Sequence, residues 1–389
     1  MKSRPNLLTL AMLVLALGLE RFAYYGTRSG LMIYLVSNEG MESGSARQLY
    51  TAVTVLALFT PLLGGLLALG VGPRITAVAG AGLALVGYGL LVVGAPSVLC
   101  LVAIAVGAGI FRACPWAIAA EELSHEASPS GADQNDAPRS ARRFAAVAAT
   151  ACLLYASVNV AAASSSFVTG WLRNASGSRA VFAFVSFVML LSLAITSLVA
   201  FLGRSTAGKS MTAPADPYRA RGAAPLRAAR PTTGLAFAGL AMLLVVELPY
   251  SVASSLSFYP AEMAQGGAGL SRATMDILTL VNPLVVIVAT VLAFALLLVA
   301  TLQRWSTPPL LLYGAGVLVF AIGLVPLALA ESSIALVLLG TAITAVGEAL
   351  VAPIAISYAA LAAKGRPATL VIAAWILLSN AGAQITRVM

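Results

Sequence analysis

Charge is scarce in this chain. Charged residues make up 10% of its 389 residues, whereas hydrophobic residues make up 60%. A soluble globular protein carries about 25% charged residues, so the composition excludes a soluble domain. The apolar segments are long enough to cross a hydrocarbon core of about 30 Å, which takes about 20 helical residues. Because they lack the two-residue alternation of barrel strands, we expect an all-α integral membrane protein.

Cysteine and histidine are also rare. Cys100, Cys114 and Cys152 lie in apolar segments without paired spacing, which predicts small buried side chains rather than disulfides or metal ligands. The one histidine, His125, lies in a polar loop, so we expect no metal site and no cofactor. The sequence also lacks an HExxH pair and a glycine-rich phosphate loop after a strand. We therefore expect no enzyme.

Long apolar stretches divide the chain into membrane spans. Lys2 and Arg4 precede the first stretch, but no small-residue cleavage site follows, so we expect a retained helix rather than a signal peptide. The pattern predicts eleven spans, at about 6–37, 46–70, 74–94, 97–119, 143–172, 178–203, 233–263, 272–302, 308–329, 332–362 and 367–387.

Basic residues account for a net charge of +9, and most of them lie in short loops beside the apolar spans. Membrane topology explains this distribution better than nucleic-acid binding does. One side of the predicted membrane collects Lys2, Arg4, Arg74, Arg139, Arg142, Arg143, Arg304, Lys364 and Arg366. Positive loops face the cytoplasm. We therefore expect a multi-pass protein of the cell's inner membrane with a cytoplasmic N-terminus.

A basic stretch rich in proline and alanine, residues 204–232, is the one long linker between spans. It predicts a cytoplasmic connection between a six-helix bundle at 1–203 and a bundle of about five helices at 233–389. Two bundles of six helices joined in this way are the organisation of major facilitator transporters. We expect that fold, with the twelfth helix missing and the protein monomeric.

The first span carries ionisable side chains, although one near the bilayer centre costs about 2.5–3.5 kcal/mol on insertion scales. Glu20, Arg21, Tyr24, Tyr25 and Arg28 fall within an arc of roughly 140° at 100° per helical residue. One interpretation is a Glu–Arg pair that only neutralises itself. A second arginine and two tyrosines on the same face favour a stripe that faces a ligand.

Other spans carry further polar candidates. The ionisable ones are Arg112, Glu247 and Glu348, and the weaker ones are Asn159, Asn282 and Asn380. Glu348 follows Thr341 and Thr344 at helical spacing, although such hydroxyls also bond their own backbone. Trp375 and Ser379 lie one turn apart, and a tryptophan there is equally consistent with an interfacial belt.

Several segments resemble the signatures of the proton-dependent oligopeptide transporter (POT) family of the major facilitator superfamily. "LGLERFAYYGTR" is similar to the first-helix pattern ExxERFxYYGxR, and "GAGIFRACP" is similar to the fourth-helix GTGxxKP. Further matches, in family order, are "LYASVNVA" to FYxxINxG, "LVNP" to SLNP, "STP" to the start of the ninth helix, "GEALVAP" to GExxxxP and "WILLSNAG" to the eleventh helix.

The resemblance implies proton-driven uptake of small peptides by alternating access. The expected partners are therefore a small peptide, protons and the lipid bilayer, and we expect no nucleic-acid partner. Arg28 would hold the peptide carboxylate, and Glu348 would face its ammonium group. The other substrate-binding residues would be Tyr24, Tyr25, Tyr155, Asn159, Asn282, Trp375 and Ser379. Proton coupling would involve Glu20, Arg21, Arg112 and Glu247, with Arg112 in place of a lysine that pairs with a seventh-helix acid.

The chain also departs from the family pattern. Leu17 replaces the first glutamate of the signature, and Leu69 replaces the acid of the helix 2–3 loop. If Arg112 replaces the lysine, the new group cannot deprotonate. These changes weaken the prediction of tight proton coupling. Two alternatives therefore remain, a facilitator-fold carrier for another small solute and a degenerate membrane protein without transport.

Overall fold

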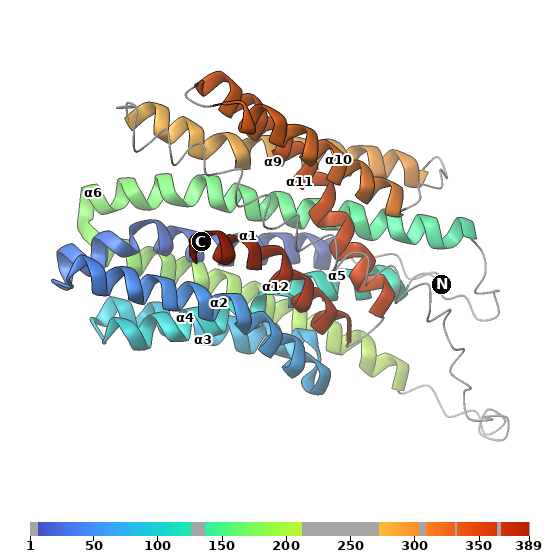
Figure 1. The fold of residues 1–389 in the computed structure, drawn as a ribbon. Coiled ribbons are helices and arrows are strands. Elements are labelled where there is room, and N and C mark those ends of the chain that lie inside the picture. Colours follow the sequence, from blue (N-terminus) through green and yellow to red (C-terminus); the bar gives the residue numbers. More distant parts are fainter. Residues whose placement is uncertain are drawn as a thin grey trace.

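The computed structural model describes residues 7–125, 137–211, 272–302, 309–330, 333–363 and 367–388, and their regular structure is entirely helical (Figure 1). This confirms the predicted all-α class. The first part comprises α1 Leu7–Ile33, a short π-helix η1 Tyr34–Asn38, α2 Ser43–Val71, α3 Pro73–Val93, α4 Ser97–Arg112, α5 Cys114–His125 and α6 Ala137–Met211. The second part comprises α9 Arg272–Leu302, α10 Pro309–Ala328, α11 Ile334–Ala363 and α12 Pro367–Val388.

The described helices follow the predicted spans closely. Among the described residues, eight segments are long and apolar enough to cross a membrane, and the one from Arg143 to Gly203 contains two predicted spans. The predicted span 367–387 is not one of the eight, because its apolar helix, Pro367–Ala381, is shorter. Gly177 separates these two because its backbone leaves the helical region, with φ 80° and ψ 174°, and the chain reverses there (Figure 1). The predicted span 233–263 lies outside the described residues, as does most of the predicted linker, although α6 continues to Met211.

The predicted fourth span is broken into two helices. α4 ends at Arg112 and α5 begins at Cys114, with a turn at Ala113 between them. Pro115 explains the break, because it has no backbone N–H to donate to the preceding turn and its ring crowds that turn. The break lets α5 leave the axis of α4 and pack against α6, α11 and α12.

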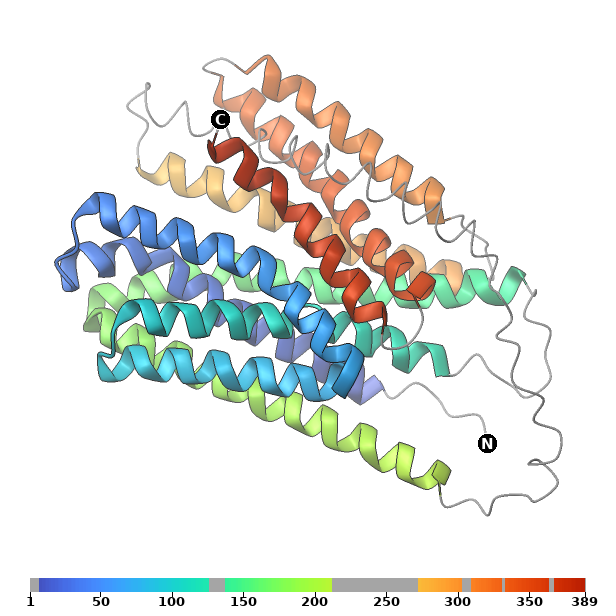
Figure 2. The same ribbon diagram turned by 60° about the horizontal axis from the view of Figure 1, so that its bottom comes forward.

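Helices from the two parts of the chain form two packed groups. α1 packs against α6, and α4 against α2 and α3, whereas α11 packs against α9, α10 and α12. The groups meet where α6 contacts α9 and α11, and where α2 contacts α12 (Figures 1 and 2). A site between the groups therefore draws side chains from distant parts of the sequence.

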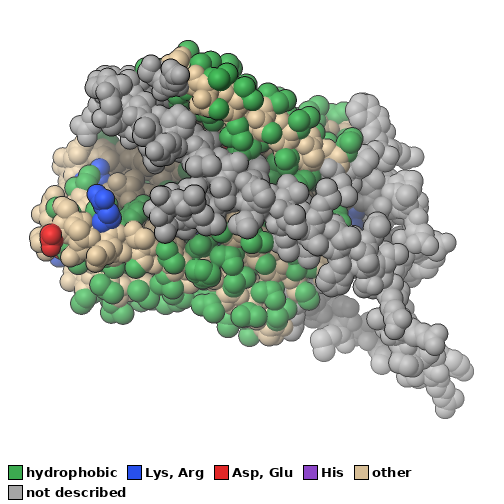
Figure 3. Space-filling model, viewed as in Figure 1, with side chains coloured by type: hydrophobic (Ala, Val, Ile, Leu, Met, Phe, Trp, Pro, Cys, Tyr) green, Lys and Arg blue, Asp and Glu red, His purple; other side chains and the backbone are tan. Residues whose placement is uncertain are grey.

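The described outer surface is rich in hydrophobic side chains (Figure 3). Examples on three helices are Phe59 at 52% exposure, Phe201 at 68% and Leu296 at 70%. Most charged side chains in this view lie at one end of the bundle (Figure 3). An apolar lateral surface is what contact with the hydrocarbon core of a bilayer requires.

Glycine allows α3 and α4 to approach closely. A Cβ added to Gly80 of α3 would lie 2.7 Å from the backbone nitrogen of Phe111 and 2.8 Å from the carbonyl oxygen of Gly107, both on α4. Small residues at such positions let membrane helices pack backbone to backbone.

We expect Gly80→Ala to destabilise the protein by about 1–3 kcal/mol, because the added methyl overpacks this contact. Thermal unfolding in detergent measures the change. Gly82→Ala is the matched control on the same helix, since nothing lies within 4 Å of a Cβ at Gly82. An equal loss of stability in both variants would show that the close approach is not the cause.

Candidate functional site

The polar face of α1 contains a buried ion pair. Glu20 and Arg21 are 1% and 3% exposed, and both carboxylate oxygens accept hydrogen bonds from the guanidinium, each at 2.5 Å. The Arg21 Cζ atom also lies 4.8 Å from the ring centre of Tyr24 and 6.0 Å from that of Tyr25. The pair thus neutralises itself, as the first interpretation of the sequence had it, while two aromatic rings flank the cation.

Arg28 belongs to a different cluster. Its Nε atom donates a hydrogen bond to the hydroxyl of Tyr50 on α2 at 2.6 Å, and its Cζ atom lies 5.6 Å from the Tyr50 ring centre. The side chain is half-buried and has no carboxylate partner among the described residues. A guanidinium has five N–H donors in a fork that fits a carboxylate. Arg28 therefore keeps donors available for an anionic ligand.

Tyr50 was not recognised as a site residue from the sequence. It lies 22 residues beyond Arg28, across the turn between α1 and α2. A tyrosine near the end of a predicted span is also typical of an interfacial residue. Only the packing of the two helices shows that its hydroxyl orients Arg28.

Glu348 joins three helices across the two halves of the bundle. Its Oε1 atom accepts a hydrogen bond from the hydroxyl of Tyr155 on α6 at 2.5 Å, and its Oε2 atom accepts one from the Asn282 amide on α9 at 3.3 Å. No described cation forms an ion pair with it. The carboxylate is thus held by neutral donors, which leaves its charge for a cationic ligand.

The remaining predicted binding residues mainly contact their own helices. Asn159 is 8% exposed and donates a hydrogen bond to the carbonyl of Tyr155 at 3.0 Å, and the Ser379 hydroxyl donates one to the carbonyl of Ile376 at 3.1 Å.

Trp375 is 6% exposed and its indole Nε1 has no hydrogen-bond partner in the described chain. Its burial distinguishes it from an interfacial belt residue. Thr344 bonds the carbonyl of its own helix at Thr341, 3.0 Å away.

Arg112 lies half-buried in the last turn of α4. It is close enough to Glu20 and Arg21 to interact with both electrostatically, but it forms no hydrogen bond or ion pair among the described residues. The predicted partner, Glu247, lies outside the described residues. The region around the buried pair therefore combines two guanidinium groups with one described carboxylate.

Arg74 has an acidic partner that the sequence did not reveal. Its Nη2 atom lies 2.5 Å from Glu122 and 3.9 Å from Glu121, both on α5, and its Nη1 atom donates to the carbonyl of Val199 at 3.4 Å. The sequence offered one hint of this partner, since Glu121 and Glu122 directly follow an apolar segment. Arg74 thus has carboxylate partners on α5, although Leu69 stands where the family has the acid of the helix 2–3 loop.

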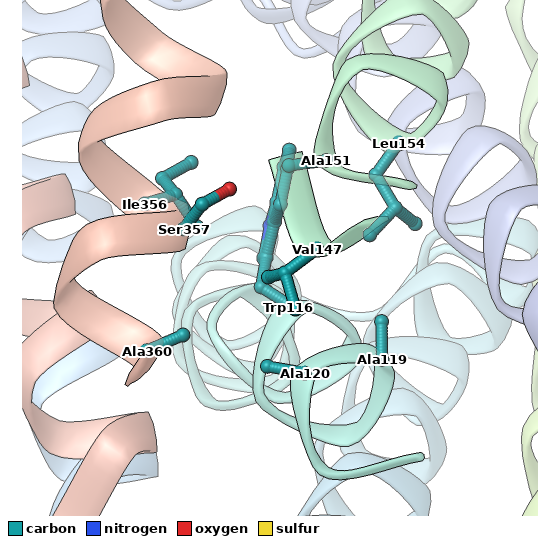
Figure 4. A pocket seen from close by; sticks show the side chains of 9 residues that line it. All are labelled: Trp116, Ala119, Ala120, Val147, Ala151, Leu154, Ile356, Ser357 and Ala360. Atoms are coloured by element: carbon teal, nitrogen blue, oxygen red, sulfur yellow. The ribbon is translucent and has the colours of Figure 1, made fainter. Parts of the chain in front are cut away.

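A pocket lies between α5, α6 and α11, away from the charged residues (Figure 4). Its walls are mostly apolar, with Trp116, Val147 and Ile356 among them, and Ser357 contributes a hydroxyl. On α6 its lining reaches Leu154, which directly precedes Tyr155, whereas on α11 it begins at Ile356, about 12 Å along the helix from Glu348 at 1.5 Å per residue. The pocket is thus a mostly apolar gap between the two groups of helices that borders the Tyr155 side of the candidate site.

Comparison with known proteins defines the class. No family model matches the chain. Over 98% of its length, the chain superposes on the major facilitator proton:xylose symporter XylE with a TM-score of 0.67 at 15% identity, covering 87% of that chain. A structure of the peptide transporter POT in complex with alafosfalin gives 0.54 at 19% identity, covering 88% of that chain. The fold is that of major facilitator membrane proteins.

Sequence similarity identifies the relatives more closely. The chain is 28% identical to dipeptide and tripeptide permease A of Citrobacter koseri over 190 residues, and this alignment covers 46% of the chain and 33% of the permease. It is 30% identical to peptide transporter 3 of Caenorhabditis elegans over 119 residues, and this alignment covers 28% of the chain and 17% of that transporter. The chain is a distant homologue of POT-family peptide transporters, and thus of transporters rather than enzymes.

Proposed function

We propose that the protein carries di- and tripeptides across the inner membrane by alternating access, in symport with protons. The observation that carries this proposal is the separation of two opposite charges. Arg28 lies on α1 in the first group of helices, and Glu348 lies on α11 in the second. A zwitterionic peptide has a carboxylate for the first and an ammonium group for the second.

Because the two charges lie on different groups of helices, peptide binding would affect how the groups are arranged. A ligand that contacts both groups of helices stabilises arrangements in which they approach each other. The Glu348 cluster already joins α6 to α9 and α11 through Tyr155 and Asn282. A bound ammonium group would neutralise the carboxylate within this cluster. Substrate binding would therefore favour closure, which alternating access requires.

Proton coupling would involve the buried cluster around Glu20 and Arg21, which is separate from Arg28 and Glu348. Protonation of Glu20 would remove the charge that binds Arg21 and leave a cation beside Arg112. We place the N-terminus in the cytoplasm, and the proposed working unit is a monomer. Arg112 and Glu247 would complete the coupling set.

The test is uptake of labelled dialanine and trialanine by proteoliposomes with an inward proton gradient. We expect a gradient of about one pH unit to raise the steady-state accumulation of peptide up to about tenfold over gradient-free vesicles if one proton moves with each peptide, since about 1.4 kcal/mol corresponds to a factor of ten in an equilibrium ratio. A protonophore should abolish the stimulation. Uptake no greater than in protein-free vesicles would contradict the proposal. A thermal shift with an amino acid or organic anion but with no peptide would favour a carrier for another solute.

A further inference from the structure

Glu348 takes part in a hydrogen bond that joins the two groups of helices. The Asn282 amide donates to its Oε2 atom at 3.3 Å, but Asn282 lies on α9, which packs in the same group as α11. Tyr155 lies on α6 in the first group, and its hydroxyl donates to Oε1 at 2.5 Å. The Tyr155 bond therefore spans the interface between the groups, whereas the Asn282 bond does not.

The side chain of Tyr155 also packs against the second group. It lies on a small cluster whose fully buried members are Val286 on α9 and Ala345 and Ala349 on α11. Its hydroxyl meets a carboxylate, and a hydrogen bond to an ionised acceptor is about twice as strong as one between neutral groups. Tyr155 thus contacts the second group through both apolar and polar atoms.

The interface bond matters because the proposed transport cycle contains two reorientations. A carrier with alternating access changes its orientation once with substrate bound and once empty. In the loaded step, a peptide between Arg28 and Glu348 would link the two groups. In the empty step, any link to Glu348 must come from the protein itself. Without it, a half-buried carboxylate at the interface would be short of hydrogen-bond donors, which is unfavourable.

We propose that Tyr155 is a positioning residue for the return of the empty carrier, because its hydroxyl holds Glu348 across the interface when no peptide does. The group that carries Arg28 thereby supplies a donor to the same carboxylate that a peptide ammonium would contact. Once a peptide is bound, its two charges join the groups, and the tyrosine bond is a smaller part of the link. Loss of the hydroxyl should therefore slow the empty step more than the loaded step. This inference rests on the proposed function and adds to it a role for Tyr155 besides contact with the substrate.

The test compares net uptake with exchange in the same proteoliposomes. Net uptake of labelled dialanine requires the return of the empty carrier. Exchange against unlabelled dialanine inside the vesicles does not, because the protein is loaded in both directions. Tyr155→Phe keeps the ring and removes only the hydroxyl. At saturating dialanine, we expect it to lower the ratio of net uptake to exchange about tenfold, the equivalent of one hydrogen bond to a charged group.

Tyr358→Phe is the matched control for this substitution. Tyr358 is a half-buried tyrosine on α11 whose hydroxyl forms no hydrogen bond among the described residues. Its substitution should leave the ratio of net uptake to exchange at the wild-type value. A ratio in Tyr155→Phe at or above the wild-type value would overturn the inference, because a role in folding or in peptide binding alone affects the loaded carrier as much as the empty one.

A distance measurement tests the interface bond without transport. If the wild type moves no peptide by net uptake or exchange, the proposed function fails, and spin labels on the two groups are used instead, without peptide. One pair of exposed positions lies at each end of the predicted spans: Ser45 with Leu329, and Val71 with Leu311. We expect Tyr155→Phe to lengthen or broaden the distances of at least one pair, and Tyr358→Phe to change neither. Distances in Tyr155→Phe identical to those of the wild type would overturn the inference.

Discussion

Arg28→Ala is expected to reduce peptide uptake by about 30- to 700-fold, because removing one partner of a desolvated charge pair costs about 2–4 kcal/mol. The half-buried guanidinium has no carboxylate partner among the described residues. A peptide carboxylate would therefore be its counter-ion. Initial rates of dialanine uptake over a range of concentrations measure the loss. Arg28→Lys should recover part of the rate, since it keeps the charge but loses the fork geometry.

Two comparisons make this prediction specific. Alanyl-alaninamide is dialanine with an amide in place of the carboxylate. The wild type should therefore take it up much more slowly than dialanine, whereas Arg28→Ala should take up both at similar rates. Tyr50→Phe removes the 2.6 Å hydrogen bond that orients Arg28 but keeps the cation. It should therefore cost only about tenfold or less, the value of a single hydrogen bond. If Arg28→Ala keeps the wild-type KM and its preference for a free carboxylate, the assignment of Arg28 is wrong.

Glu348→Gln is expected to remove the preference for a free peptide amine. The amide keeps an oxygen for the hydroxyl of Tyr155, which now bonds Oε1 at 2.5 Å, so the contact between α6 and α11 should persist. The charge that attracts an ammonium group is lost. We expect dialanine uptake to fall by about 10- to 100-fold, or about 1.4–2.7 kcal/mol, in line with a hydrogen-bonded charge.

The informative quantity is the ratio of dialanine uptake to N-acetyl-dialanine uptake. This ratio should be high in the wild type and close to one in Glu348→Gln. Tyr155→Phe is the control, because it removes the neutral partner and keeps the carboxylate, so the ratio should remain high. A high ratio in Glu348→Gln would place the amine elsewhere.

The course of the helices was predictable because the bilayer sets their length. Apolar runs of about 20 residues admit few alternatives, and the chain breaks where local chemistry requires it. Gly177 reverses the chain with a positive φ, and the turn at Ala113 precedes Pro115. The common face of Tyr24 and Arg28 likewise followed from 100° per residue.

The partners of the polar groups were not predictable in the same way. Tyr155 and Glu348 are 193 residues apart, and Arg74 and Glu122 are 48 apart. Any of several polar side chains fits the same helical pattern, and only packing decides which two meet.

The sequence by itself determined the helical class, the positions of the described spans and the face of α1 that carries Glu20, Arg21 and Arg28. These properties depend on local periodicity and on the thickness of the membrane. The tertiary structure decided that Arg21 is occupied by Glu20, whereas Arg28 is oriented by a neutral hydroxyl and keeps donors for a ligand. That distinction depends on distances between side chains on different helices, which the order of residues along one helix does not specify.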